Sequence, residues 1–160
     1  MARGKILVRI RSTLFLLPAW FSPHKALRVF FHRLRGVNVG RNVEIGYFCV
    51  IDNVHPDLVT IEDKVVIATG TVIISHDNSY YYTHGGAVKH APVIIKKNSF
   101  IGAGSVINPG VTIGEYAIVG CNSVVIKNVP AYAVVGGVPV RILKENGKDN
   151  NESDQENENT

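Results

Sequence analysis

Residues 95–130 read IKKNSF-IGAGSV-INPGVT-IGEYAI-VGCNSV-VIKNVP when the chain is written in groups of six. Every group begins with isoleucine or valine, and the fifth residue of every group is small or β-branched. Because these two residue types make up about a quarter of the chain, six in succession at this spacing has a chance probability on the order of 1 in 5,000. The stretch is therefore a genuine six-residue repeat.

The same period continues towards the N-terminus, where it is interrupted twice. Residues 39–56 read VGRNVE-IGYFCV-IDNVHP, and after a slip of four residues positions 61–78 read IEDKVV-IATGTV-IISHDN. A longer insertion then separates residue 78 from residue 95. The chain holds twelve such groups, and their first residues are Val39, Ile45, Ile51, Ile61, Ile67, Ile73, Ile95, Ile101, Ile107, Ile113, Val119 and Val125.

A six-residue period has a direct structural interpretation. One aliphatic side chain per group points inward from a short strand, and the following residues turn a corner, where glycine, asparagine and aspartate tolerate the backbone conformation. Three corners close one triangular coil, and stacked coils pair as parallel strands around an apolar column. The repeats therefore predict an all-β fold, a single-stranded parallel β-helix of about four coils, or five with the irregular ends.

The segment before the repeats, residues 1–36, is predicted to be a short helical N-terminal arm. Apolar residues recur at helical spacing up to Leu17, Pro18 is expected to end this helix, and Ser22-Pro23 is expected to begin a second one. The second helix carries an apolar stripe that we expect to pack against the core, formed by Leu27, Phe30, Phe31 and Leu34.

Two further segments depart from the repeat. The body, residues 37–143, contains an inserted loop at about residues 79–91, with three consecutive tyrosines and a pair of glycines. A loop of this length in so regular a body is usually functional or disordered. Residues 144–160 are acidic and contain no apolar side chain to bury, so they are predicted to form a disordered tail.

The net charge of +4 belongs to the arm. Residues 1–35 contain eight lysines and arginines and no acidic residue, whereas residues 36–143 hold seven charges of each sign. Such an arm can contact anionic lipid or nucleic acid, or present a solvated helix face, and we expect no nucleic-acid partner. Cys49 and Cys121 lie inside repeats without metal-ligand spacing, so both are expected to be small buried residues in a reducing cytoplasm.

His76 is the best candidate for chemistry, because it lies where the regular body breaks into the insertion, directly before Asp77. An imidazole on a rigid coil beside a loop is well placed for acid–base catalysis, since its pKa lies near neutrality. A metal site formed by His76, His84 and His90 is the alternative, but their spacing departs from the His-x4-His of β-helical carbonic anhydrases, so no metal is expected. The other histidines are interpreted as surface, capping or structural residues, namely His24, His32 and His55.

Residues 92–143, PVIIKKNSFIGAGSVINPGVTIGEYAIVGCNSVVIKNVPAYAVVGGVPVRIL, closely resemble the C-terminal half of hexapeptide-repeat acyltransferases. The strings INPGVTIG and GVPVRIL are the most specific part, and the body from 37 to 143 fits. The nearest subgroups are the maltose and galactoside O-acetyltransferases and the sugar O-acetyltransferases of capsule and lipopolysaccharide synthesis. The resemblance implies a left-handed β-helix, a homotrimer, and acetyl-CoA as co-substrate.

The resemblance also implies individual roles. His76 corresponds to the family's general base, which removes a proton from the acceptor hydroxyl in a ternary complex at a subunit interface. Phe100 flanks the acyl pocket, the N–H of Ala103 beside Gly102 faces the thioester oxygen, and Cys121 lines the pantetheine channel. The cations that correspond to those meeting the phosphates of coenzyme A are Lys127, Arg141 and Lys144.

The acceptor side departs from the maltose and galactoside enzymes. Their early-coil asparagine is absent, whereas Asp52 falls where they have an acidic acceptor contact. The departure puts a simple disaccharide in doubt as the acceptor. The candidates for the acceptor pocket are Asp52, Asp77, Tyr80, Tyr81 and Tyr82.

The sequence therefore predicts an acetyl-CoA-dependent O-acetyltransferase for a saccharide or saccharide precursor, in a prokaryotic cytoplasm. Peripheral contact with the inner membrane through residues 1–35 is a further hypothesis. An N-acetyltransferase of an amino sugar, or a serine- or xenobiotic-directed relative, is the nearest alternative. A carbonic anhydrase-like metalloprotein and a non-catalytic scaffold remain as weaker alternatives.

Overall fold

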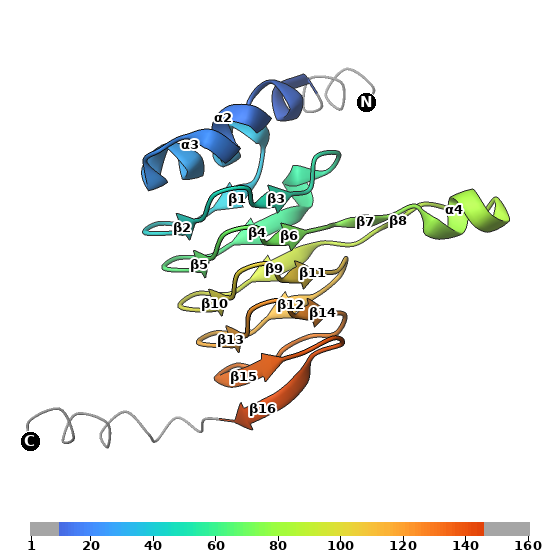
Figure 1. Cartoon of the computed structure of the whole chain (residues 1–160). Helices are drawn as coiled ribbons and strands as arrows, with labels where there is room; N and C mark the ends of the chain where they lie inside the picture. Colours follow the sequence, from blue (N-terminus) through green and yellow to red (C-terminus); the bar gives the residue numbers. More distant parts are fainter. Residues whose placement is uncertain (1–9, 146–160) are drawn as a thin grey trace, which may run out of the picture.

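The computed structural model describes residues 10–145, and its body is a stack of triangular coils (Figure 1). Three sheets of parallel strands form the sides, with one antiparallel strand, β16, at the end of side B. Side A contains β1 (Asn38–Val39), β4 (Val59–Ile61), β9 (Val93–Ile95) and β12 (Thr112–Ile113). Side B contains β2 (Glu44–Ile45), β5 (Val66–Ile67), β10 (Phe100–Ile101), β13 (Ile118–Val119), β15 (Ala133–Gly136) and β16 (Arg141–Glu145). Side C contains β3 (Val50–Ile51), β6 (Val72–Ile73), β11 (Val106–Ile107) and β14 (Val124–Val125).

The register between coils follows the six-residue repeat. Ile95 pairs with Ile113, Ile101 with Val119 and Ile107 with Val125, so each repeat position stacks on the residue three groups later. The slip and the insertion leave this register intact, because both fall in turns that lead from side C to side A. The slip holds the 3-10 helix η1 (Pro56–Leu58). The repeat therefore predicted the strand pairing.

The first residues of the groups form the core. Eleven of the twelve are at most 1% exposed, and Val39 in the first coil is partly buried against them. Burying one such aliphatic side chain contributes about 1.5–3 kcal/mol, so this column is the main source of stability. Neighbouring corners also approach closely, because a Cβ on Gly102 would lie 2.5 Å from the backbone nitrogen of Cys121.

The helices of the arm cover the open end of the first coil (Figure 1). Residues 10–14 are helical, followed by α2 (Leu16–Phe21) and α3 (Lys25–Arg35). The expectation that Pro18 ends the first helix was wrong, because the break lies at Phe15 and Pro18 sits in the first turn of α2. A proline ring clashes with the carbonyl four residues earlier, so the helix is interrupted before the proline instead of at it.

Helix α3 turns the face that holds Arg28, Val29 and Arg35 towards the coils, and these residues are buried. The prediction that the apolar stripe packs against the core was wrong for Leu27 and Phe30, which are 44% and 49% exposed, whereas Phe31 and Leu34 are half-buried. The reason lies in the first coil, whose outermost carbonyls have no preceding coil to bond them.

Three arginines of α3 cap these carbonyls, one on each side of the prism. Arg33 Nε donates to the Val39 carbonyl on side A (3.2 Å), and Arg28 Nε donates to the Ile45 carbonyl on side B (2.7 Å). Arg35 Nη2 donates to the Ile51 carbonyl on side C (2.8 Å). The arm is therefore fixed to the body by hydrogen bonds that replace a missing coil.

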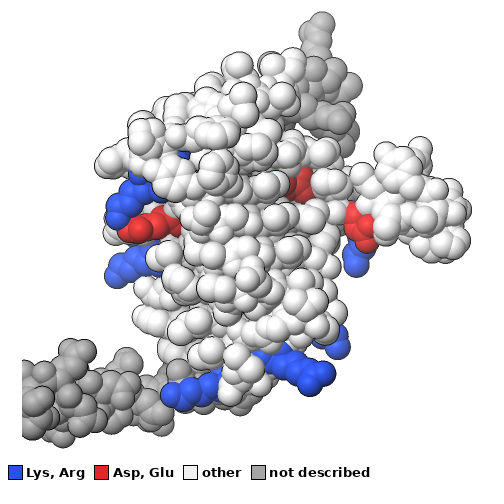
Figure 2. All heavy atoms as spheres, viewed as in Figure 1, with Lys and Arg blue, Asp and Glu red and all other residues white. Residues whose placement is uncertain are grey.

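The insertion is an ordered hairpin instead of an irregular loop. Strands β7 (His76–Asp77) and β8 (Lys89–His90) pair in antiparallel fashion, and α4 (Ser79–His84) forms the tip. The hairpin projects from the stack in Figures 1 and 2. None of the helices between residues 10 and 145 has the length and apolar character needed to span a bilayer.

The predicted acidic tail, residues 144–160, lies mostly outside the described residues. Its first two residues, Lys144 and Glu145, end strand β16. Residues 146–160 lie beyond the described part, as do residues 1–9 of the arm.

Candidate functional site

Asp52 lies at the centre of the candidate site, directly after β3. Its side chain is fully buried. Oδ1 accepts hydrogen bonds from the backbone nitrogens of Val54 (2.8 Å) and His55 (2.9 Å), which closes a tight turn. Oδ2 accepts from the backbone nitrogen and the hydroxyl of Ser75, at 2.8 and 2.7 Å. The carboxylate thus joins the turn of the first coil to the end of β6 in the second.

His76 completes this arrangement. Its Nδ1 lies 2.6 Å from Asp52 Oδ2, and its side chain is 21% exposed. Burial alone would raise the pKa of Asp52, but hydrogen bonds from His55, Ser75 and His76 hold that pKa well below its usual range. Asp52 is therefore a carboxylate that only accepts, so Nδ1 carries a proton and a neutral imidazole keeps its lone pair on Nε2. Within residues 10–145 no group bonds to Nε2.

The structure changes the interpretation of Asp52. The sequence assigned it to the acceptor pocket, but a fully buried carboxylate with five hydrogen-bonding donors has no face left for an acceptor. Its contacts are those of a group that orients a histidine. Ser75, which sequence reasoning missed, holds the same oxygen, and its place in a repeat gave no signal of this role.

Two more imidazoles, those of His55 and His90, lie beside the Asp52–His76 pair. The His55 ring lies 4.3 Å from the His90 ring and 6.0 Å from the His76 ring, between centroids. Burial lowers the pKa of His55, and the neighbouring His90 lowers it further. His90 lies beside His76 because the two residues are paired across the β7–β8 hairpin. Sequence reasoning treated His55 as structural and missed this cluster.

Of the three histidines predicted as an alternative metal site, His76 and His90 are paired, whereas His84 lies apart from them. His84 lies on α4, where its ring stacks on Tyr80 at 4.6 Å between centroids. Among the residues that the structure describes, no three histidine, cysteine or acidic side chains are arranged to hold a metal ion.

The remaining acceptor candidates lie on the hairpin. Asp77 is exposed at its base, where its carboxylate accepts from the backbone nitrogen of Ser79. Tyr80, Tyr81 and Tyr82 are 62%, 50% and 79% exposed on α4. Because the hairpin projects from the stack, these tyrosines lie away from the rest of their own chain (Figure 1).

The coenzyme A candidates occupy a different corner, between sides B and C. Phe100 is 41% exposed on β10, and Gly102 and Ala103 follow it into the corner. Among the described residues, Gly102 and Gly104 donate backbone hydrogen bonds to neighbouring coils, whereas Ala103 N–H does not, so this donor is free for a ligand. Cys121 lies at the same corner one coil later and is exposed, unlike the buried Cys49, so the expectation that both are buried was wrong for Cys121.

The three predicted phosphate-binding cations lie towards the end of the stack. Arg141 and Lys144 are exposed on β16, and Lys127 is exposed after β14. Figure 2 shows basic side chains over the end of the molecule that holds β15 and β16. Strands β15 and β16 are antiparallel, so residues 137–140 form the turn that leads to Arg141.

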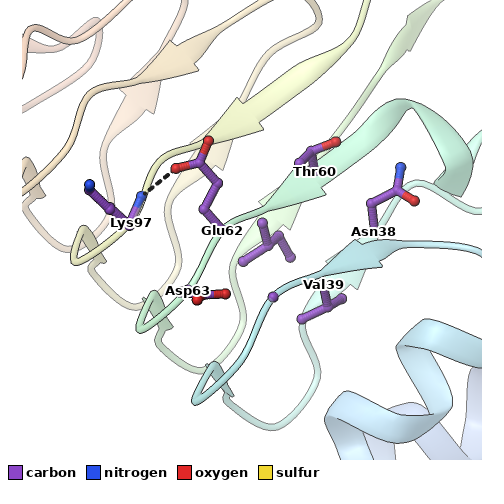
Figure 3. A pocket seen from close by; sticks show the side chains of 8 residues that line it. Asn38, Val39, Thr60, Glu62, Asp63 and Lys97 are labelled. Atoms are coloured by element: carbon purple, nitrogen blue, oxygen red, sulfur yellow. Dashed lines mark hydrogen bonds between the residues drawn. The ribbon is translucent and has the colours of Figure 1, made fainter.

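A hollow of about 530 Å³ on side A is lined by none of the candidate acceptor or coenzyme A residues (Figure 3). Its acidic groups already have partners. Glu62 accepts from the backbone nitrogen of Lys97 at 3.0 Å, and Asp63 binds the guanidinium of Arg41. The chemistry therefore centres on the Asp52–His76 pair and not on this hollow.

Comparison with known proteins agrees with this architecture. Residues 92–127 match the family model described as bacterial transferase hexapeptide (six repeats). The galactoside O-acetyltransferase of Escherichia coli (strain K12) is 34% identical over 129 residues, which cover 79% of this chain and 61% of that enzyme. The chain thus spans about three fifths of this relative's length.

Two solved structures share the fold. The hexapeptide-repeat acetyltransferase VCA0836 of Vibrio cholerae O1 biovar eltor, complexed with acetyl coenzyme A, has a TM-score of 0.71 at 26% identity, and 87% of each chain is covered. AntD, an N-acyltransferase from Bacillus cereus in complex with dTDP and 3-hydroxybutyryl-CoA, has a TM-score of 0.59 at 27% identity, over 71% of this chain and 74% of that one.

Proposed function

Because this chain belongs to the hexapeptide-repeat transferases, we propose that it transfers an acetyl group from acetyl-CoA to a hydroxyl of a saccharide or saccharide precursor. The observation that carries this proposal is the Asp52–His76 pair, in which a buried carboxylate fixes one ring nitrogen and leaves the other free. The winding of the β-helix is taken to be left-handed, as the family implies.

His76 acts as the general base. Its Nε2 takes the proton of the acceptor hydroxyl while the oxygen attacks the thioester carbonyl, so a C–O bond forms and the C–S bond breaks. The imidazolium then gives its proton to the departing thiolate, and free coenzyme A results. Asp52 stabilises the imidazolium through its 2.6 Å contact with Nδ1. The Ala103 N–H donates to the oxyanion of the tetrahedral intermediate.

The site is shared between two copies in a homotrimer. His76 and the corner that holds Ala103 are separated by the width of side C. Thr69 marks the same corner in the coil of His76, because its carbonyl accepts from the nitrogen of Gly104, and seven residues lead from Thr69 to His76. At about 3.3 Å per extended residue this span is on the order of 20 Å. One chain therefore cannot bring its own base and its own thioester donor together, but neighbouring prisms can.

Coenzyme A lies in the groove between copies. Phe100 flanks the acyl group and Cys121 lines the pantetheine arm of the cofactor. The phosphates of the cofactor meet the exposed cations Lys127, Arg141 and Lys144. No metal takes part in the transfer as proposed.

The acceptor binds beside Asp77 and the α4 tyrosines. Exposed tyrosines on a projecting hairpin offer flat apolar faces with a polar edge, which suits a sugar ring. An amino-sugar N-acyltransferase is the second candidate, since AntD shares the fold and is an N-acyltransferase. An acceptor panel that pairs each sugar with its amino analogue separates the two.

The outer face of the arm supports a peripheral membrane contact. Four apolar side chains at helical spacing are 59–66% exposed there, namely Ile10, Leu14, Leu17 and Phe21. They lie opposite the buried Ser12 and Ala19, so they face away from the coils. Residues 1–35 carry eight cations and no anion, so two such faces would repel each other, whereas an anionic bilayer would attract them.

The membrane contact is tested by co-sedimentation with phosphatidylglycerol-containing vesicles. Replacing Leu14 and Leu17 together by glutamate is expected to abolish binding, while the same change at exposed Ile118 and Ile126 of the body leaves it intact. A wild-type chain that stays in the supernatant would overturn the proposal, and so would equal binding by the arm variant.

The activity itself is tested by the release of free thiol from acetyl-CoA with a panel of sugars. His76→Ala is expected to lower kcat about 100-fold or more, because the general base is lost. His24→Ala, which removes an exposed imidazole at the start of α3, is the matched control and should keep wild-type kcat. Full activity of His76→Ala would refute the assignment, and a monomeric yet fully active chain would refute the shared site.

A further inference from the structure

Among the described residues of the arm, Arg35 is the most deeply buried charged side chain, at 0% exposure. We propose that Arg35 is a positioning residue that holds the Asp52 turn in place and thereby aligns His76 for catalysis. The inference rests on the proposed function for its activity readout. It makes the N-terminal arm part of the catalytic machinery and not only a cap on the first coil.

The guanidinium forms hydrogen bonds with three successive residues of the turn. Arg35 Nη2 donates to the Ile51 carbonyl (2.8 Å), the Asp52 carbonyl (3.3 Å) and Asn53 Oδ1 (2.7 Å). On the arm side, Nε donates to the Ser12 carbonyl at 3.1 Å. Ser12 Oγ in turn donates to the Asn53 carbonyl at 3.0 Å. The backbone around Asp52 is therefore tied to two helical segments.

The Asp52 side chain holds the same turn from the inside. Its Oδ1 binds the nitrogens of Val54 and His55, while Oδ2 binds Ser75 and His76. Arg35 fixes the carbonyl side of residue 52, and the carboxylate fixes the backbone nitrogens two and three residues further along the turn. A displacement of this backbone would move Oδ2 away from Nδ1 of His76. Because catalysis depends on alignment, an error of about 1 Å can cost about 100-fold in rate.

Charge strengthens the link between Arg35 and Asp52. Burial lowers the pKa of Arg35 to about 10, and the Asp52 carboxylate opposes that decrease, so the guanidinium stays cationic at neutral pH. Burial also lowers the pKa of His32 to about 3, helped by Arg35 and Arg28, so His32 is neutral. A neutral His32 accepts from Arg35 Nη1 through Nδ1 at 3.0 Å. The cation therefore contacts an uncharged histidine and the backbone carbonyl of Asp52, and the nearby carboxylate charge favours its cationic form.

Arg28 provides a matched control on the same helix. It is 7% exposed, and it donates to the Ile45 carbonyl (2.7 Å) and the Ser22 carbonyl (2.9 Å) while its guanidinium lies 4.1 Å from the centre of the Tyr47 ring. It thus caps the first coil as Arg35 does, but on side B, away from the Asp52 turn. A purely structural role would make the two arginines equivalent.

The experiment compares Arg35→Gln and Arg35→Lys with Arg28→Gln and Arg28→Lys in the full chain. We expect Arg35→Gln to lower kcat about 10- to 100-fold with little change in KM for acetyl-CoA, and Arg35→Lys to recover part of the loss. Arg28→Gln should lower the thermal midpoint and leave kcat near wild type. Equal kcat losses in the two series, or an unchanged kcat in Arg35→Gln, would overturn the proposal.

A second variant and a spectroscopic readout keep the test decisive if Arg35→Gln does not fold. Asn53 is exposed and provides one of the acceptors of Arg35, so Asn53→Ala should fold and lower kcat in the same direction by a smaller factor. Histidine ring 15N spectra show which nitrogen of His76 is protonated. The Nδ1-protonated form should decrease in Asn53→Ala and Arg35→Lys but not in Arg28→Lys, and its persistence would refute the positioning role.

The spectra do not depend on turnover. If the wild-type chain transfers no acetyl group to any acceptor, the proposed function fails, whereas the ring spectra still decide whether Arg35 aligns His76. The titratable groups that face His76 are Asp52, His55 and His90, so their signals are assigned in the same samples.

Discussion

Replacing Asp52 by asparagine separates the carboxylate's charge from its shape. The amide keeps the size of the side chain, and its oxygen can still accept from Val54 and His55. Its NH2 group then faces the two donors of Ser75 and the Nδ1–H of His76, all of which need an acceptor. Three hydrogen bonds to one oxygen are lost together, and His76 is driven towards the tautomer in which Nε2 carries the proton.

The expected losses follow from those contacts. Leaving a buried hydrogen-bond donor without an acceptor costs about 1–3 kcal/mol. The two Ser75 donors both lose their acceptor, so the free energy of unfolding should fall by about 2–6 kcal/mol. A base in the wrong tautomer cannot accept a proton, so kcat should fall about 100- to 10,000-fold. KM for acetyl-CoA should change little, because the coenzyme A candidates lie at another corner.

The pH dependence of stability gives an independent check. The folded-state pKa of Asp52 lies well below its unfolded value, so its contribution is complete above the unfolded pKa and is lost as pH falls through the acid range. Asp52→Asn should therefore flatten the acid side of the stability curve while it lowers the plateau at neutral pH. Denaturant unfolding from pH 7 to pH 3 measures both effects.

Asp63→Asn is the control for this prediction. Asp63 also lies at a corner and accepts from the backbone nitrogen of Arg41, but its side chain is partly exposed and remote from His76. The change should leave kcat near wild type. If Asp52→Asn keeps a kcat within about threefold of wild type, the buried carboxylate does not govern the base and the reasoning fails.

Three further changes probe separate parts of the molecule. Ile107→Ala should lower the free energy of unfolding by about 2–5 kcal/mol in urea titrations, because Ile107 is fully buried in the apolar column, and a loss below about 1 kcal/mol would contradict that role. Cys121→Leu should raise KM for acetyl-CoA while the thermal midpoint stays unchanged, since Cys121 is exposed; an unaltered KM would remove it from the pantetheine channel. Tyr82→Ala should raise KM for the acceptor alone, because Tyr82 is 79% exposed on α4, and a change confined to KM for acetyl-CoA would argue against the sugar-binding role.

The sequence predicted what the repeat controls. A side chain such as Ile101 recurs every sixth residue, so its inward direction, its strand and its partner Val119 all follow from counting. The position of His76 at the break in the pattern follows in the same way. These inferences work because a solenoid turns local spacing directly into spatial position.

The sequence failed where one residue's environment depends on distant segments. Leu27 and Phe30 have the helical spacing of a buried stripe, yet unpaired carbonyls of the first coil select Arg28 and Arg35 for the buried face. Nothing in the six-residue group that contains Asp52 indicates that Ser75 and His76, one coil later, bind its carboxylate. Such demands of buried polar groups override periodicity, and spacing alone does not reveal them.

The two interruptions of the repeat explain where the site forms. Both lie in turns from side C to side A, the four-residue slip in the first coil and the hairpin in the second. Strand pairing fixes the register on every side, so extra residues can leave the coil only at a corner. Two irregular corners that stack directly on each other bring Asp52 and His55 against His76 and His90. If the two interruptions lay at different corners, the width of one side of the β-helix would separate these groups. The Asp52 carboxylate would then be too far from the His76 imidazole to hold it.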